Sequence, residues 1–173
     1  MSDERGYTLV EMLTVLVIFG TVMSALMVLF VQGTGAEVDL NNRFEAQQAA
    51  RLALDKIRRE AHCATAVTVS SASSVTLNLP SYCPTGNGSV TWCTVSLGTS
   101  RYGLYRKAGA TCDSTGVRWA DYLTTANVFS YAAQSTTSLA KLSVDFPIDV
   151  KPSRPVDTYE LKDDIVLRNS TRS

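Results

Sequence analysis

A single carboxylate stands where acidic side chains are rare. Glu11 lies at the start of an apolar run, and residues 12–31 after it carry no formal charge. A charged side chain inside lipid costs ~3 kcal/mol or more, so it persists only with a partner or a purpose. Without a partner, a carboxylate there stays buried and uncompensated. The alternative is that Glu11 only snorkels to the headgroup level of a plain membrane anchor.

Four cysteines are the second set of residues with chemistry of their own. They are spaced 20, 10 and 19 residues apart, with no Cys-x-x-Cys pair. Zinc and redox motifs bring two cysteines close in sequence, so we expect two disulfides in an exported chain. Of the three pairings, we favour Cys63 with Cys83 and Cys93 with Cys112. Hairpin register argues against the second, since Cys93 would lie opposite roughly Leu104.

The other reactive side chains form no catalytic, cofactor-binding or metal-binding pattern. His62 is the only histidine, and a surface histidine at a helix end is much commoner than a metal ligand or a catalytic partner of Cys63. Five aspartates near the C-terminus lack the spacing of a calcium loop. We interpret these as solvated strand and loop residues: Asp145, Asp149, Asp157, Asp163 and Asp164.

A basic and aromatic stretch, residues 101–107, has the composition of a single-stranded nucleic-acid site. Strand alternation sends Arg101 and Lys107 to one face and Arg106 to the other, which dilutes the basic patch. We therefore favour an exposed edge hairpin over a nucleic-acid site. Sixteen basic and sixteen acidic side chains also imply no polyanion partner globally.

The apolar run is long enough to cross a membrane. As a helix, residues 12–31 span ~30 Å, the hydrocarbon thickness of a bilayer. A secretory signal places its small-residue cleavage site after the apolar core. Here the small residue, Gly6, comes before the core, behind a short polar leader. Cleavage at Gly6 would leave the apolar helix on the mature protein.

This arrangement resembles the type IV prepilin signal. Gly6 corresponds to the residue before the cut, Thr8-Leu-Val to the segment after it, and Glu11 to the acidic fifth residue of the mature chain. Tyr7 departs from the family, which most often has Phe there. The resemblance implies that a prepilin peptidase cuts between Gly6 and Tyr7, that the Tyr7 amine is N-methylated, and that Glu11 pairs with the Tyr7 amine of a neighbouring subunit.

A second helical stretch and a β domain follow. Two glycines, Gly33 and Gly35, mark a weak point or bend between the helical halves. Lys56 and Glu60 form one of the opposite-charge pairs expected on the solvated side. Alternating runs predict strands at 65–69, 74–79, 90–95, 101–107, 128–131, 139–150 and 159–169, and a turn or helical piece at 119–123. The apolar face of the second helix is expected to comprise Phe44, Ala46, Ala49, Ala50, Ala53, Ile57 and Ala61.

These elements predict an α+β, pilin-like fold, in which a long N-terminal helix packs on an antiparallel β-sheet. We expect a removed leader at 1–6, a transmembrane and assembly helix at 7–32, an amphipathic half at 33–62 and an extracytoplasmic β domain at 63–173. Residues 48–60 and 159–169 resemble J-type minor pseudopilins and PilW-like minor pilins.

The resemblance implies a non-enzymatic minor subunit of a type IV pilus or a type II secretion pseudopilus, in a tip or initiation complex. Its partners would be the prepilin peptidase, other pilins and the plasma membrane, crossed once with the leader cytoplasmic and the β domain outside. Two alternatives stay open: a minor pilin of DNA uptake, and a membrane-anchored surface-binding protein that does not polymerise.

Overall fold

The computed structural model describes residues 8–151 and 158–167 of the 173-residue chain. The chain divides into two compact units, Met1–Asn41 and Asn42–Ser173, and one helix, α1 (Leu9–Cys63), contributes to both. The weak point or bend expected at Gly33 and Gly35 does not end the helix, because α1 continues through both glycines. Each glycine costs ~1 kcal/mol against alanine, which weakens a helix without ending it.

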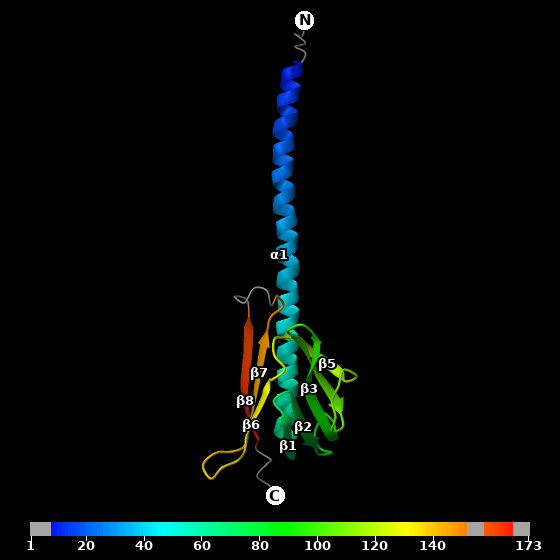
Figure 1. The fold of residues 1–173 in the computed structure, drawn as a ribbon, viewed down its shortest axis with the longest axis vertical. Coiled ribbons are helices and arrows are strands. Elements are labelled where there is room, and N and C mark those ends of the chain that lie inside the picture. Colours follow the sequence, from blue (N-terminus) through cyan, green and yellow to red (C-terminus); the bar gives the residue numbers. More distant parts are fainter. Residues whose placement is uncertain (1–7, 152–157, 168–173) are drawn as a thin grey trace. The chain divides into compact units, whose positions relative to one another are not determined.

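In the described part of the chain, eight strands follow α1 and form one antiparallel sheet. Their order is β1-β2-β3-β4-β5-β7-β6, with β8 paired to the remaining edge of β7. In Figure 1, β3 and β5 lie on one side of the C-terminal part of α1 and β7 and β8 on the other, so the sheet curls about the helix. The strands are β1 (Ala66–Ser71), β2 (Ser74–Leu79), β3 (Gly88–Gly98), β4 (Arg101–Ala108), β5 (Val117–Leu123), β6 (Phe129–Ala132), β7 (Lys141–Ile148) and β8 (Tyr159–Val166).

The core lies between the last turns of α1 and the concave face of the sheet. The predicted face of α1 is confirmed at Ala46, Ala50, Ala53, Ile57 and Ala61, which are all buried. From the sheet, the largest fully buried side chains include Trp92, Leu77, Leu104, Phe146 and Leu142. This arrangement is the α+β pilin fold that the sequence predicts.

Phe44 does not belong to the buried face of α1. Its side chain is 58% exposed, whereas Ala46 is buried. Two residues along a helix of 3.6 residues per turn correspond to about 200° around its axis, so both cannot face the sheet. Leu54, which the predicted face omits, is buried instead.

Residues 119–123 form most of β5, so the predicted turn or helical piece is wrong. Strand β5 pairs with β4 through two register shifts, and each leaves one extra residue on β5. Tyr122 lies at one shift with a φ of 62°, in the left-handed region. These bulges break the two-residue alternation by which a strand is recognised in a sequence.

Pro147 lies inside β7, although a proline has no N–H to donate to a strand ladder. Its carbonyl accepts a hydrogen bond from Thr124 N at 3.0 Å, on the side away from β8. The N and C=O of one strand residue point to the same side, so the proline nitrogen also faces away from β8. On that side β6 pairs only with residues 141–144 and β5 only with Ile148, so the missing N–H interrupts no ladder.

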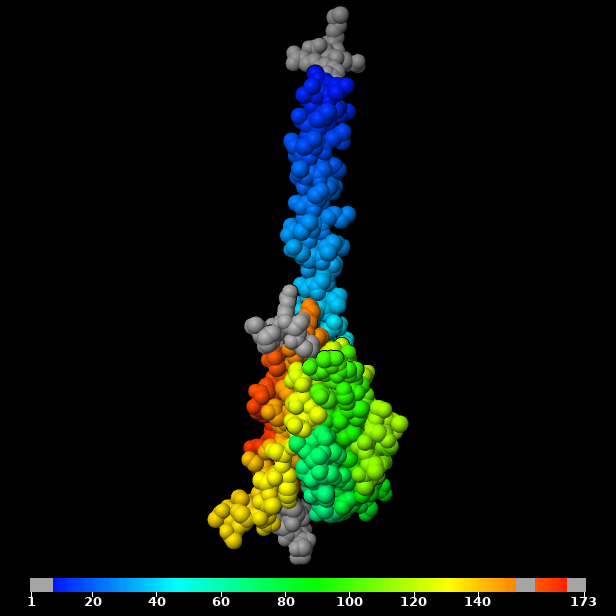
Figure 2. All heavy atoms as spheres, in the orientation of Figure 1, coloured from blue at the N-terminus to red at the C-terminus, as the bar shows by residue number. Residues whose placement is uncertain are grey.

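The connection between β6 and β7 projects from the β domain, as the yellow segment of Figures 1 and 2 shows. Its tip is closed by Ser135 N, which donates to Ser138 O at 2.9 Å. The Ser135 hydroxyl also accepts from the backbone N–H groups of Thr137 and Ser138. These bonds give the exposed turn a fixed backbone.

Candidate functional site

Thr8 and Glu11 cap the N-terminus of α1. The Glu11 carboxylate accepts hydrogen bonds from Thr8 N and Thr8 Oγ1, both at 3.1 Å, and Glu11 N donates to Thr8 Oγ1 at 3.3 Å. This is the reciprocal capping box of a threonine followed three residues later by a glutamate. The carboxylate also lies in the first turn, where the helix dipole favours negative charge.

Within the apolar segment, the hydroxyl groups bond to the helix itself. Thr14 donates to Glu11 O, Thr21 to Ile18 O, Ser24 to Gly20 O and Thr34 to Val31 O, at 2.8–3.0 Å. Each of these hydroxyl groups thereby donates a hydrogen bond to the carbonyl three or four residues earlier in the helix. Such bonding is what a lipid environment requires, because it offers no water as a partner.

One helix is long and apolar enough to cross a membrane, among the residues that the structure describes. It is α1, whose most apolar 18-residue window has a mean hydropathy of 2.5 and is 0% buried. Large side chains such as Leu16, Ile18, Phe19 and Phe30 are more than half exposed. By length and composition, this part of α1 fits a membrane span.

One of the three predicted processing residues lies within the described range. Glu11 is described, whereas Gly6 and Tyr7 lie outside the described residues. Residues 1–27 match the family model of the prokaryotic N-terminal methylation motif. The chain carries this methylation motif. The match includes Gly6, Tyr7 and Glu11, the positions singled out from the sequence.

The methylation motif supports a type IV pilin-like protein that is processed by a prepilin peptidase. It covers the N-terminal segment only, and the β domain lies outside it. No match was found among curated proteins or among solved structures.

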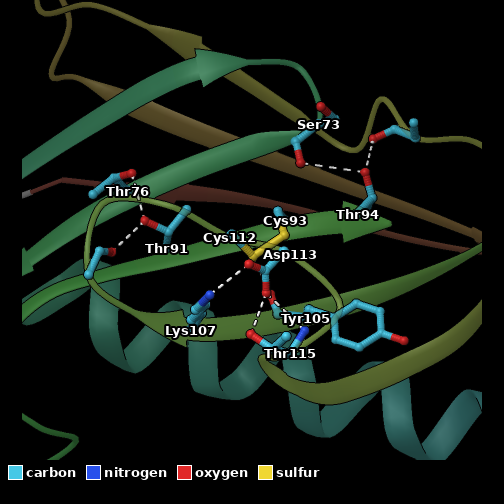
Figure 3. Close-up of a disulfide and its surroundings, with 12 residues drawn as sticks. Ser73, Thr76, Thr91, Cys93, Thr94, Tyr105, Lys107, Cys112, Asp113 and Thr115 are labelled. Carbon is cyan, nitrogen blue, oxygen red and sulfur yellow. Dashed lines mark hydrogen bonds and ion pairs between the residues drawn. A yellow bond between two sulfur atoms is a disulfide. The ribbon is translucent and has the colours of Figure 1, made fainter. Parts of the chain in front are cut away.

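Two disulfides join the four cysteines in the pairing that we favoured. Cys63, the last residue of α1, bonds to Cys83 in the β2–β3 connection, and Cys93 of β3 bonds to Cys112. The register objection to the second bond does not apply. Cys93 is indeed opposite Tyr105, but Cys112 lies beyond the end of β4, in the connection to β5. That connection folds back over the hairpin (Figure 3).

Asp113 fixes the connection next to this disulfide. It accepts from Lys107 Nζ at 2.7 Å, from Thr115 N at 2.9 Å and from Thr115 Oγ1 at 2.5 Å (Figure 3). The Lys107 bond, and then the bonds from Thr115, lower the pKa of Asp113 to about 2. The cystine and this carboxylate together define the path of the β4–β5 connection.

A buried carboxylate, Glu60, fastens α1 to the sheet. It is 0% exposed and accepts from Trp92 Nε1 at 2.8 Å, from Arg106 Nε at 2.9 Å and from Arg106 Nη2 at 2.9 Å. Lys56 Nζ is 3.5 Å away. The prediction that Lys56 and Glu60 form a solvated pair is therefore wrong. The position of Glu60 beside buried Ile57 and Ala61 was the signal that could have shown this.

Two further contacts hold β8 to the same part of α1. Arg58 donates to Asp163 through Nε at 2.9 Å and Nη2 at 2.8 Å, while Arg51 contacts the Tyr159 hydroxyl at 3.2 Å. Asp163 is thus an ion-pair partner of the helix rather than a solvated residue. Asp163 is one of the five aspartates that lack the spacing of a calcium loop.

The expectation that residues 101–107 form an exposed edge hairpin is wrong, because β4 lies between β3 and β5 in the sheet. Its cations do not form an open basic patch either. Arg101 donates to Asp121 at 2.9 and 2.7 Å, Arg106 is bound to Glu60, and Lys107 to Asp113. Every positive charge of the stretch therefore has a carboxylate beside it. This local neutralisation works against the phosphate contacts that nucleic-acid binding needs.

Among the other aspartates interpreted as solvated, Asp149 is buried, so that interpretation is wrong for it. Asp145 pairs with Lys162, Asp149 accepts from Lys151 N, and hydrogen bonds from Ser143 and then Lys141 lower the pKa of Asp164. Asp157 lies outside the described residues. Over residues 8–151 and 158–167, no group of three or more His, Cys, Asp or Glu is placed to hold a metal ion.

Proposed function

We propose that this chain is a minor subunit of a type IV pilus or of a type II secretion pseudopilus. The observation that carries the proposal is Glu11, which begins an apolar, membrane-compatible helix inside the matched methylation motif. A plain anchor needs neither the carboxylate nor the leader before it. The resemblance of residues 48–60 and 159–169 to J-type pseudopilins and PilW-like minor pilins supports a place in a tip or initiation complex.

Processing would convert the N-terminus into an assembly element. The prepilin peptidase cuts between Gly6 and Tyr7, and the new Tyr7 amine is N-methylated. In the single chain the Glu11 carboxylate is held by the Thr8 N–H and hydroxyl. These neutral donors leave its charge uncompensated, so the Tyr7 amine of a neighbouring subunit is the stronger partner in a low dielectric. Only the correct axial offset between subunits brings the two charges together.

The location follows from the same elements. The helix crosses the plasma membrane once, the leader stays cytoplasmic, and the β domain is exported before assembly into the filament. Two disulfides in the β domain support the oxidising side. The partners are the prepilin peptidase and other pilins, and the role is structural rather than enzymatic.

The experiment that tests processing is N-terminal mass spectrometry of the membrane fraction, in a host with a prepilin peptidase. We expect a mature chain that begins at methylated Tyr7. Gly6→Val should block the cut, because a branched side chain hinders the site, while membrane insertion stays normal. An intact Met1 on the wild-type chain would refute the proposal.

A further inference from the structure

The edge of β5 that faces away from β4, its outer edge, is largely unpaired. On its other edge β5 pairs with β4 along the strand, but on the outer edge it forms one pair only, Leu123 with Ile148 of β7. Among the described residues, no strand pairs with the outer edge of β5 before Leu123. Figures 1 and 2 show β5, in yellow-green, at the margin of the β domain. Unpaired N–H and C=O groups along such an edge are a template for another strand.

A cleft lies beside β5, between this strand with Arg101 of β4 and residues 42–49 of α1. Its volume is about 400 Å³, and both walls belong to the unit Asn42–Ser173. The helix wall is formed by small and polar side chains, including Ala46 and Ala49. The strand wall comprises Arg101, Arg118, Trp119, Ala120, Asp121 and Tyr122. The cleft therefore places side-chain contacts directly beside the open backbone edge.

The strand wall offers more positive than negative charge. One carboxylate, Asp121, binds two guanidinium groups: Arg101 at 2.7 Å and Arg118 at 3.1 Å. Arg118 is 53% exposed, and this ion pair uses one of its nitrogens, so further donors face solvent. The helix wall contributes one acid, Glu45, which also has an interaction partner. An incoming carboxylate would find its counter-charge at Arg118.

Two features distinguish this wall. The indole N–H of Trp119 is buried and has no acceptor in the described structure. A buried donor without an acceptor is unfavourable and calls for an explanation. Tyr122 also holds a left-handed backbone, with the Arg101 guanidinium 4.1 Å from its ring centre. Such strain is concentrated at ligand clamps.

We propose that the cleft beside β5 binds a short, extended, acidic segment of a second protein, which adds as a strand to the open edge with a carboxylate against Arg118. Main-chain bonds to the edge hold the segment, and Arg118 selects its charge. The bulges of β5 restrict the added strand to a few residues, which disfavours unselective edge-to-edge association. The inference rests on the β domain and is independent of how the N-terminus is processed.

The test uses the full oxidised chain in detergent micelles and a capped nine-residue peptide of alternating threonine and valine with a central glutamate. NMR resonances of residues 117–121 and of the Trp119 indole N–H should shift, and the amides along the open edge of β5 should gain protection from hydrogen exchange. A peptide with a central lysine should bind about tenfold more weakly, because attraction to Arg118 becomes repulsion.

Two variants make the test specific. Arg118→Glu should reverse the preference and bind the lysine peptide better. Lys162→Glu, which changes a similarly exposed cation on the edge strand β8, should leave binding unchanged. Shifts centred on β8, equal binding of both peptides, or no shift at millimolar peptide would overturn the proposal. So would β5 shifts that depend on protein concentration without peptide, since the occupant would then be a second copy of this chain.

Discussion

Removal of the Glu60 carboxylate should destabilise the β domain more than any other single charge deletion on α1. In Glu60→Ala, Arg106 and Lys56 lose the carboxylate that neutralises them, and the Trp92 indole loses its acceptor. The side chains of Arg106 and Lys56 are only 20% and 19% exposed, so water replaces the lost carboxylate poorly. Breaking such a buried pair from one side costs ~3–5 kcal/mol.

Asp55→Ala is the matched control on the same helix. Asp55 pairs with Arg58 at 3.2 Å, but the two side chains are 57% and 44% exposed. An exposed pair of this kind contributes ~0–1 kcal/mol. For a urea dependence of ~2 kcal/mol per molar, the unfolding midpoint should fall by roughly 1.5–2.5 M for Glu60→Ala and by less than about 0.5 M for Asp55→Ala.

The assay is urea unfolding of the full chain in detergent with its disulfides intact, followed by tryptophan fluorescence. Trp92 reports directly, because its indole contacts Glu60. Should Glu60→Ala fail to fold, the double variant Glu60→Leu/Arg106→Met decides, since apolar residues of similar volume can replace a buried ion pair with little loss. Equal midpoints for Glu60→Ala and Asp55→Ala would refute the reasoning, as would a double variant less stable than Glu60→Ala.

Three further predictions concern other parts of the chain. Glu11→Gln should insert and be cleaved normally, yet crosslinking to other pilins should fall about a hundredfold. The amine of a neighbouring subunit would then be buried without its counter-charge, which costs ~3–5 kcal/mol. Undiminished crosslinking would indicate a simple anchor. Alkylation under denaturing, non-reducing conditions should label none of the four cysteines, and each disulfide should contribute ~2–4 kcal/mol; four labelled thiols would contradict this. The folded pKa of Asp113, about 2, lies below the usual value of 3.8, so its contribution to stability is present above pH 3.8 and is lost as pH falls toward 2. A carboxyl-carbon NMR titration measures that pKa, Asp113→Asn should remove this part of the pH dependence, and a midpoint near 4 would disprove it.

The parts of the molecule predicted correctly from the sequence depend on local patterns. The apolar length of residues 12–31 is enough to predict a membrane-compatible helix, because that property needs no other segment. The alternation Leu142, Val144, Phe146 and Ile148 likewise predicts β7, and all four side chains are buried. The cystine pairs were harder, since four cysteines allow three connectivities and chain spacing only ranks them.

Strand β5 was missed because its local pattern is broken. Each of the two extra residues in this seven-residue strand changes which of the following side chains face inward and which face outward. Trp119, Asp121 and Tyr122 therefore do not follow a regular alternation of apolar and polar residues. The strand is defined by pairing with β4, which neither its length nor its composition indicates. The cleft proposed here as a binding site is formed by the same irregular residues. Irregularity that defeats a periodic pattern is thus itself a reason to examine a strand for function.

The burial of Glu60 shows why charge spacing along a helix cannot decide exposure. The spacing of four residues between Lys56 and Glu60 is a local pattern, and it suggests a solvated ion pair. The groups that make burial tolerable, Trp92 and Arg106, are 32 and 46 residues away in sequence and are brought in by the sheet. The helical face still carried the information, because Ile57 and Ala61 enclose Glu60 on the buried side. An acidic residue on the buried face of a helix requires hydrogen-bond donors from the element that faces it. Where a sequence places an acid on such a face, an inward-pointing arginine is therefore expected on a neighbouring strand.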